Sequence, residues 1–101
     1  MTRVLTVSRV GVPLARKSEY LALVHALAAR LAARGQRLWV FQSREQPDRW
    51  LEFSESADAA THRAAGPADA EEARLESALA VVVASREGEQ QFWDEVRPQG
   101  Q

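Results

Sequence analysis

The segment 35–55 constrains the fold most, because its sequence predicts a β-hairpin with bulky apolar side chains on both faces. β-Branched and aromatic residues predict strands over 36–43 and 49–55, and the Pro47-Asp48 pair between them is typical of a turn. Most of the aromatic side chains of the chain lie in this hairpin. A sheet that is apolar on both faces needs cover on both faces, since large exposed apolar patches are rare on monomers.

Helical periodicity identifies the segment 14–34 as the longest helix. Pro13 precedes it and Gly35 follows it, and these residue types are typical of the start and the end of a helix. Its apolar residues recur at spacings of three and four, which gives one stripe made of Tyr20, Leu23, Val24, Leu27 and Leu31. A helix with one apolar stripe covers one face of a neighbouring sheet.

A further strand and a second helix flank these elements. The β-branched segment 3–10, bounded by Gly11, predicts the first strand. The polar segment 56–66 contains at most a short helix, and a longer helix is predicted over 68–84. The apolar stripe of this longer helix consists of Leu75, Ala78, Leu79, Val82 and Val83. Its end, 79–84, also fits a buried strand, and the continuing stripe favours the helix.

The C-terminal part of the chain predicts one more strand. Arg86-Glu87-Gly88-Glu89 is typical of a turn, and the segment 90–96 then forms the last strand before Pro98. The resulting order, β-α-β-β-α-β, is that of the ferredoxin-like α+β fold. We therefore expect a single domain over 1–101, in which two helices lie on one face of a four-stranded antiparallel sheet.

The alternation within the strands predicts which side chains lie on each face of this sheet. The face under the helices is assigned Leu5, Val7, Leu38, Val40, Leu51 and Phe53. The other face is assigned Val4, Thr6, Trp39, Phe41, Trp50 and Glu52, with Phe92 or Trp93. A second copy of the chain is the predicted cover for this second face, because two-fold pairing through one self-complementary patch is the commonest solution.

Composition argues against several classes of partner. Thirteen basic residues nearly balance fourteen acidic ones, so no net field draws the protein to nucleic acid or to an anionic membrane. No apolar run is long enough to span a bilayer. The N-terminal residues show no signal-peptide pattern, and we expect a cytoplasmic protein. The chain has no cysteine, and its two histidines lack metal-ligand spacing. The sequence therefore predicts no metal and no cofactor.

Two runs of the hairpin resemble the dimeric α–β barrel group, which includes the antibiotic-biosynthesis-monooxygenase-like proteins: Trp39-Val40-Phe41 and Gln46-Pro47-Asp48-Arg49-Trp50-Leu51-Glu52-Phe53. The start of the first helix, Val12-Pro13 leading to Glu19-Tyr20-Leu21, is similar as well. The resemblance implies a dimeric α–β barrel and, for some members, oxidation of polyaromatic substrates without flavin or metal. Haem-degrading members use an asparagine, and this chain contains none.

Glu52 is the most informative candidate for chemistry. The strand pattern places it among aromatic side chains, where a carboxyl group has a raised pKa unless it is paired. The simplest interpretation is an ion pair with Arg37 or Arg3, and the alternative is a polar anchor or proton acceptor in an apolar cavity. His25, beside the stripe of the first helix, is a second catalytic candidate and is more simply a surface residue. His62 is predicted to be exposed to solvent in the polar connector.

The predicted ligand-binding residues are Trp39, Phe41, Trp50, Glu52 and Trp93. Their aromatic rings either fill an interface or stack on a planar ligand. Three functions remain open at this stage. The first is a homodimer that binds a small apolar or aromatic molecule, the second is a cofactor-independent monooxygenase, and the third is an interaction domain without a pocket. The sequence leaves catalysis undecided.

Overall fold

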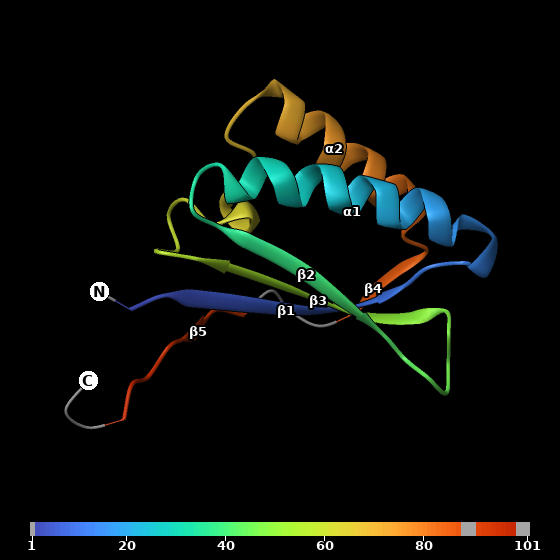
Figure 1. Ribbon diagram of the computed structural model, residues 1–101, viewed down its shortest axis with the longest axis horizontal. Helices are drawn as coiled ribbons and strands as arrows, with labels where there is room; N and C mark the ends of the chain where they lie inside the picture. The colour runs from blue at the N-terminus through green and yellow to red at the C-terminus, as the bar shows by residue number, and fades with distance from the viewer. Residues whose placement is uncertain (1, 88–90, 99–101) are drawn as a thin grey trace.

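The computed structural model describes residues 2–87 and 91–98 of the chain. Its strands are β1 (Val4–Gly11), β2 (Arg37–Gln42), β3 (Arg49–Ser56), β4 (Ser85–Glu87) and β5 (Trp93–Asp94). Its helices are α1 (Lys17–Ala32) and α2 (Ala70–Val82), and 3-10 turns form η1 (Leu14–Arg16) and η2 (Arg63–Ala65). Both helices lie on one face of the sheet (Figure 1). The predicted ferredoxin-like α+β fold is confirmed.

The strands are all antiparallel, in the order β2-β3-β1-β4, and β5 also pairs with β1. β4 pairs with the C-terminal end of β1, through Arg9–Gly11, and β5 pairs with its N-terminal end, through Val4 and Leu5. The final strand of the fold is thus divided into two short segments along one edge of β1. The sequence prediction of a turn at 86–89 and a strand over 90–96 was wrong in part, because Ser85–Glu87 is already paired. Residues 88–90 lie outside the described part of the chain.

Local signals explain both helices. The predicted stripe of α1 is buried at Tyr20, Val24, Leu27 and Leu31, and Gly35 ends this segment with a φ of 76°, which glycine adopts without strain. Asp69 caps the N-terminus of α2, because its carboxylate accepts a hydrogen bond from the backbone N–H of Glu72. α2 continues to Val82. The prediction of a helix rather than a buried strand at 79–84 is therefore confirmed up to Val82.

The predicted faces of β1 and β3 are reversed in the structure. Val4, Thr6, Ser8 and Val10 are buried under the helices, whereas Leu5 and Val7 lie on the other face. On β3, the buried residues are Trp50, Glu52, Ser54 and Ser56. The prediction was right for β2, where Leu38 points to the helices and Trp39 and Phe41 point away. The observed register places Val40 opposite Glu52 and Glu52 opposite Ser8.

The reversal has a physical cause. A strand shifted by one residue exchanges all of its side chains between the two faces, and on hydrophobicity alone Leu5, Val7, Leu51 and Phe53 are the better core residues. The structure instead buries hydroxyl and carboxylate groups under the helices. It can do so because no buried side-chain nitrogen or oxygen among the described residues lacks a hydrogen-bond partner. Within residues 2–87 and 91–98, no helix is long and apolar enough to cross a membrane.

Candidate functional site

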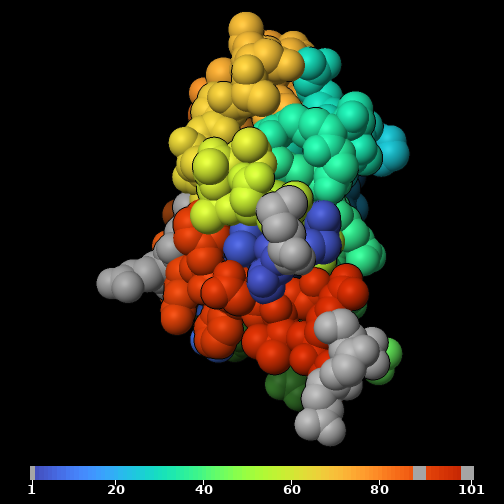
Figure 2. Space-filling model, turned by 90° about the vertical axis from the view of Figure 1, so that its left-hand side faces the viewer, coloured from blue at the N-terminus to red at the C-terminus, as the bar shows by residue number. Residues whose placement is uncertain are grey.

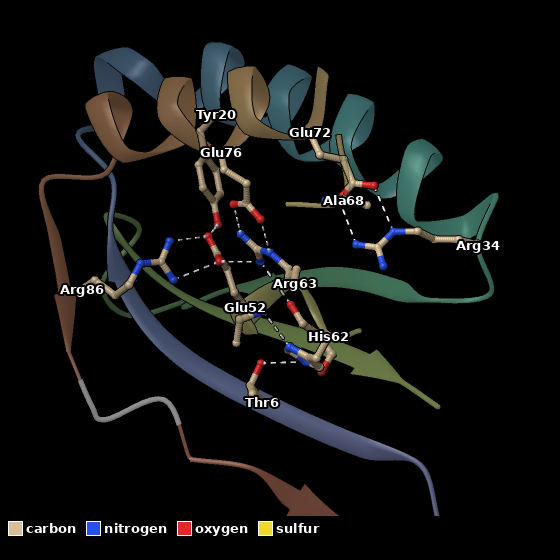
Figure 3. Close-up of polar contacts among 12 residues, drawn as sticks. Thr6, Tyr20, Arg34, Glu52, His62, Arg63, Ala68, Glu72, Glu76 and Arg86 are labelled. Carbon is tan, nitrogen blue, oxygen red and sulfur yellow. Dashed lines mark hydrogen bonds and ion pairs between the residues drawn. The ribbon is translucent and has the colours of Figure 1, made fainter. Parts of the chain in front are cut away.

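A buried network of charged side chains lies between the sheet and α2, centred on Glu52 (Figure 3). The hydroxyl of Tyr20, from α1, donates a hydrogen bond of 2.7 Å to Oε2 of Glu52. Arg86, from β4, reaches Oε1 of Glu52 at 3.1 Å, and Arg63, from η2, reaches the same oxygen at 3.4 Å. Four elements therefore meet at one carboxylate that is only 2% exposed.

Arg63 extends this network to α2. Its Nε and Nη2 atoms donate to the two carboxylate oxygens of Glu76, at 2.8 and 2.6 Å. Its Nη1 atom also donates to the hydroxyl of Ser54, at 3.1 Å. The bidentate pairing of Arg63 with Glu76 is the strong and geometrically specific form of an arginine–carboxylate contact. Two carboxylates and two guanidinium groups, those of Glu52, Glu76, Arg63 and Arg86, thus compensate one another.

The network decides the protonation state of its members. Burial opposes ionisation of Glu52, and the guanidinium groups of Arg63 and Arg86 outweigh it, so the pKa of Glu52 lies below its ordinary value of 4.5. Burial, together with the neighbouring Glu52 carboxylate, raises the pKa of the Tyr20 hydroxyl. Glu52 is therefore a carboxylate and Tyr20 a neutral phenol. The predicted ion pair of Glu52 exists, but its partners are Arg63 and Arg86. The predicted partners were wrong, because Arg3 pairs with Glu55 and Arg37 lies over the ring of Trp39.

His62 is buried rather than exposed, contrary to the sequence prediction, and is 1% accessible. Its Nδ1 atom accepts a hydrogen bond from the backbone N–H of Ala64 at 2.9 Å, so Nε2 carries the proton and donates to the backbone carbonyl of Ser54 at 2.9 Å. Burial lowers the pKa of His62. A neutral ring with both nitrogens engaged holds η2 against β3, and therefore positions Arg63.

A cleft of about 260 Å³ opens beside the network, between α2 and strands β1 and β3. We call it the α2 cleft. Its polar wall consists of Thr6, Ser8, Ser54, Arg63 and Arg86, with Glu76 at the edge, and its apolar wall consists of Ala64, Pro67, Leu79 and Ala80. Hydroxyl and guanidinium groups and apolar side chains therefore line the same cleft. Arg63 and Arg86 were absent from the sequence prediction, because nothing local distinguishes them from surface arginines.

The face of the sheet away from the helices carries a different group of side chains. We call it the open face, and it consists of Leu5, Val7, Arg9, Trp39, Phe41, Leu51, Phe53 and Trp93. Phe53 stacks on Trp39, with ring centroids 5.4 Å apart, and meets Phe41 edge-on at 5.5 Å. Phe41 and Trp93 are 57% and 55% exposed. The predicted aromatic patch therefore exists, although its membership differs from the prediction.

The structure separates the predicted ligand-binding residues. Trp39, Phe41 and Trp93 lie on the open face, and Trp50 and Glu52 lie under the helices. Trp50 packs edge-on against Tyr20, with ring centroids 5.2 Å apart. His25, the second catalytic candidate, is exposed on α1, in agreement with its simpler interpretation. Within the part of the chain that the structure describes, no group of three or more His, Asp or Glu residues could hold a metal ion.

The sequence matches no protein-family model and no curated protein. Solved structures do resemble it. An antibiotic-biosynthesis-monooxygenase-like protein of Nitrosomonas europaea has a TM-score of 0.78 at 17% identity, over 97% of this chain and 94% of that one. SnoaB of Streptomyces nogalater, a cofactor-independent oxygenase, has a TM-score of 0.71 at 16% identity over 100% of both chains.

A third structure, a conserved protein of Methanosarcina mazei, has a TM-score of 0.72 at 15% identity, over 97% of this chain and 95% of that one. The three proteins share few residues with this chain. At such low identity the similarity lies in the fold. The chain thus has the ferredoxin-like fold of the antibiotic-biosynthesis-monooxygenase-like structures.

Proposed function

We propose that this protein binds a small aromatic molecule with an oxygen function in the α2 cleft. The composition of the cleft carries the proposal, because Arg86 and the hydroxyl groups of Thr6, Ser8 and Ser54 line it together with Leu79 and Ala80. Cavities of ~150 Å³ already hold a benzene ring, so a volume of about 260 Å³ suits a molecule of one or two rings. The oxygen would accept hydrogen bonds from Arg86, whose side chain is 32% exposed.

Binding is a better-supported function than catalysis, because every candidate base at the cleft is engaged. Glu52 is paired with two arginines and Tyr20, Glu76 is paired with Arg63, and both ring nitrogens of His62 hold backbone groups. Among the described residues that line or adjoin the cleft, no carboxylate or imidazole is therefore left to take a proton from a ligand.

Titration calorimetry with two matched probes tests this proposal. 1-Naphthol is expected to bind at least tenfold more tightly than 1-methylnaphthalene, because a hydrogen bond to a charged group contributes about 1.5–3 kcal/mol. The substitution Ala80→Phe, at an exposed position on the rim of the cleft, should abolish 1-naphthol binding. The matched control is Ala22→Phe, at an exposed position on α1. Equal binding by Ala80→Phe and by the wild type would contradict the proposal.

Cofactor-independent oxygenation is the second candidate function. SnoaB, which has this fold, is a cofactor-independent oxygenase, and the guanidinium groups of Arg63 and Arg86 would favour the anionic form of a phenolic substrate. Such an anion can reduce O₂ directly. One oxygen atom then becomes the carbonyl oxygen at a ring carbon that was a methylene, and the other oxygen atom leaves as water. Oxygen uptake in the presence of anthrone tests this candidate. Uptake that is lost in Ala80→Phe and kept in Ala22→Phe would support it, and no uptake above the protein-free rate would contradict it.

We also propose that two copies of the chain pair through the open face. The exposed Phe41, Leu51 and Trp93 would bury apolar area worth ~25 cal/mol per Å² on pairing. Monomers seldom leave such a patch in water, and a two-fold axis would let the same patch cover itself. In such a dimer the α2 cleft would remain on the outer side of each sheet, so pairing and ligand binding are separable.

Light scattering tests this pairing. The wild type is expected to have twice the mass of the chain, and Phe41→Glu is expected to have the mass of a single chain, because it buries a charge in the proposed interface. Leu14→Glu is the control, since Leu14 is 61% exposed and lies in η1, outside the sheet. A monomeric wild type at micromolar concentration would contradict the pairing.

A further inference from the structure

The C-terminal segment 91–98 is an arm that leaves the body of the molecule. All eight of its residues are exposed, and they include Trp93, at 55%, and Val96, at 86%. The arm is fixed at its base, where Trp93 and Asp94 pair with β1 and the ring of Phe92 meets His62 edge-on at 5.3 Å. It lies on the side of β1 opposite the helices (Figures 1 and 2). Trp93 lies opposite Leu5 in this pairing and therefore lies on the open face, toward the region where a second copy would lie.

A pocket of about 270 Å³ lies at the other end of the sheet, beside the β2–β3 turn. We call it the hairpin-end pocket. Its apolar lining consists of Val10, Phe41, Trp50 and Leu51, and its charged lining consists of Arg9, Arg49 and Glu87. Arg49 pairs with Glu87 at 3.5 Å. Arg9 has no carboxylate partner within the described parts of the chain, so it contributes an uncompensated positive charge to the rim.

The arm carries an apolar group and a negative charge that suit this pocket. The side chain of Trp93 is apolar and large, and Glu95 follows it on the same face of the extended chain. Glu95 has only one ion-pair partner within the arm, the exposed Arg97 at 3.9 Å. A tryptophan followed two residues later by a carboxylate thus matches an apolar pocket with the guanidinium group of Arg9 on its rim.

Symmetry brings the two together. β5 and β4 lie along the same edge of β1, at its opposite ends. Consider two copies whose open faces meet, related by a two-fold axis that lies between the sheets, parallel to them and perpendicular to the strands. This rotation reverses the strand direction and places the β4–β5 edge of one copy over the β4–β5 edge of the other. The β5 end of one copy then lies over the β4 end of the other copy, where Arg9 and the hairpin-end pocket are. By symmetry, the contact forms twice.

We propose that the arm of each copy docks in the hairpin-end pocket of a second copy, with Trp93 in the apolar part and Glu95 beside Arg9. This inference rests on the proposed pairing through the open face and specifies which residues hold it. A free small molecule in the hairpin-end pocket is the competing occupant. The second copy is favoured because the same chain supplies both the aromatic group and the compensating carboxylate.

Sedimentation equilibrium of five variants, one of them a control, tests this docking. Trp93→Ala is expected to raise the dissociation constant of the dimer on the order of 10²- to 10³-fold, because an aromatic anchor is lost from both symmetric contacts. Glu95→Arg and Arg9→Glu should each raise it at least tenfold, since each creates a like-charge contact. The double variant Glu95→Arg/Arg9→Glu should return to within about threefold of the wild type, because the pair is restored in reverse order. Val81→Ala, at a position that is 70% exposed on α2, should have no effect.

The outcomes separate this inference from the pairing on which it rests. A monomeric wild type would overturn both of them. A dimeric wild type whose dissociation constant is the same in Trp93→Ala would overturn the docked arm and leave the open-face pairing intact. Weakened single variants without recovery in the double variant would overturn the contact between Glu95 and Arg9. Circular dichroism melts of all variants, performed well above the dissociation constant, show that the compared proteins are folded.

Discussion

Replacing Glu52 with Gln is expected to lower the free energy of unfolding by about 3–5 kcal/mol, the usual result of removing one partner from a buried ion pair. The carboxylate is 2% exposed, compensates Arg63 and Arg86, and accepts a hydrogen bond from the hydroxyl of Tyr20. An amide keeps the volume of the side chain but leaves two buried or half-buried guanidinium groups with one carboxylate, that of Glu76. Urea denaturation measures the change, at a single protein concentration because association also contributes to stability.

The matched control for this experiment is Glu55→Gln on the same strand. Glu55 pairs with Arg3 at 3.3 Å, and both side chains are about one-third exposed. Exposed pairs of this kind contribute about 0–1 kcal/mol, so the control should cost little. Equal losses for the two variants would show that Glu52 has no special role and that the network around it does not hold the sheet to α2.

The second large effect is expected on acidification, which should unfold the protein. The pKa of Glu52 is held below 4.5 by Arg63 and Arg86 against the effect of burial, and the pKa of Glu72 is held below 4.5 mainly by its hydrogen bonds with Arg34. A carboxyl group with a lower pKa in the folded state stabilises that state at every pH above its unfolded pKa. This stabilisation is lost as the pH falls through 4.5 and towards the folded pKa. Circular dichroism at a series of pH values measures the loss.

His62 should begin this loss at a higher pH. Burial keeps its pKa below 6.5 in the folded protein, so the unfolded chain binds a proton first as the pH falls, and stability declines below about 6.5. His62→Gln is expected to be less stable at neutral pH, because it loses one of the contacts to Ser54 and Ala64. It should nevertheless lose no stability between pH 6.5 and 5. An unchanged decline in this window in His62→Gln would contradict the role assigned to His62.

The sequence predicts the order of elements well, because local patterns determine it. The stripe of α1 from Tyr20 to Leu31, the glycine that follows it and the turn at Pro47 are each readable within a few residues. Those patterns are sufficient for the two helices, the hairpin and their arrangement as a ferredoxin-like fold. The division of the last strand into β4 and β5 is not readable in this way, because pairing with the two ends of β1 is a tertiary contact.

The candidate site is only partly predictable, since its partners come from distant segments. Glu52 stands out as a carboxylate in an aromatic strand, but Arg63 and Arg86 lie 11 and 34 residues further along the chain. Their contacts also explain why the predicted faces of β1 and β3 were wrong. Hydrophobic alternation takes polar side chains to be exposed, whereas here the network satisfies them and Thr6, Ser8, Glu52 and Ser54 become the buried face.

The most direct measurement of where a ligand binds is a nitrogen-15 NMR titration with 1-naphthol. The proposed site predicts amide shift changes that are largest at the cleft residues Ser8, Ser54, Ala64, Ala80 and Arg86. It also predicts small changes on the open face at Trp39, Phe41 and Trp93. Changes concentrated at those three aromatic residues, with none along α2, would contradict the cleft and place the ligand between the two sheets instead.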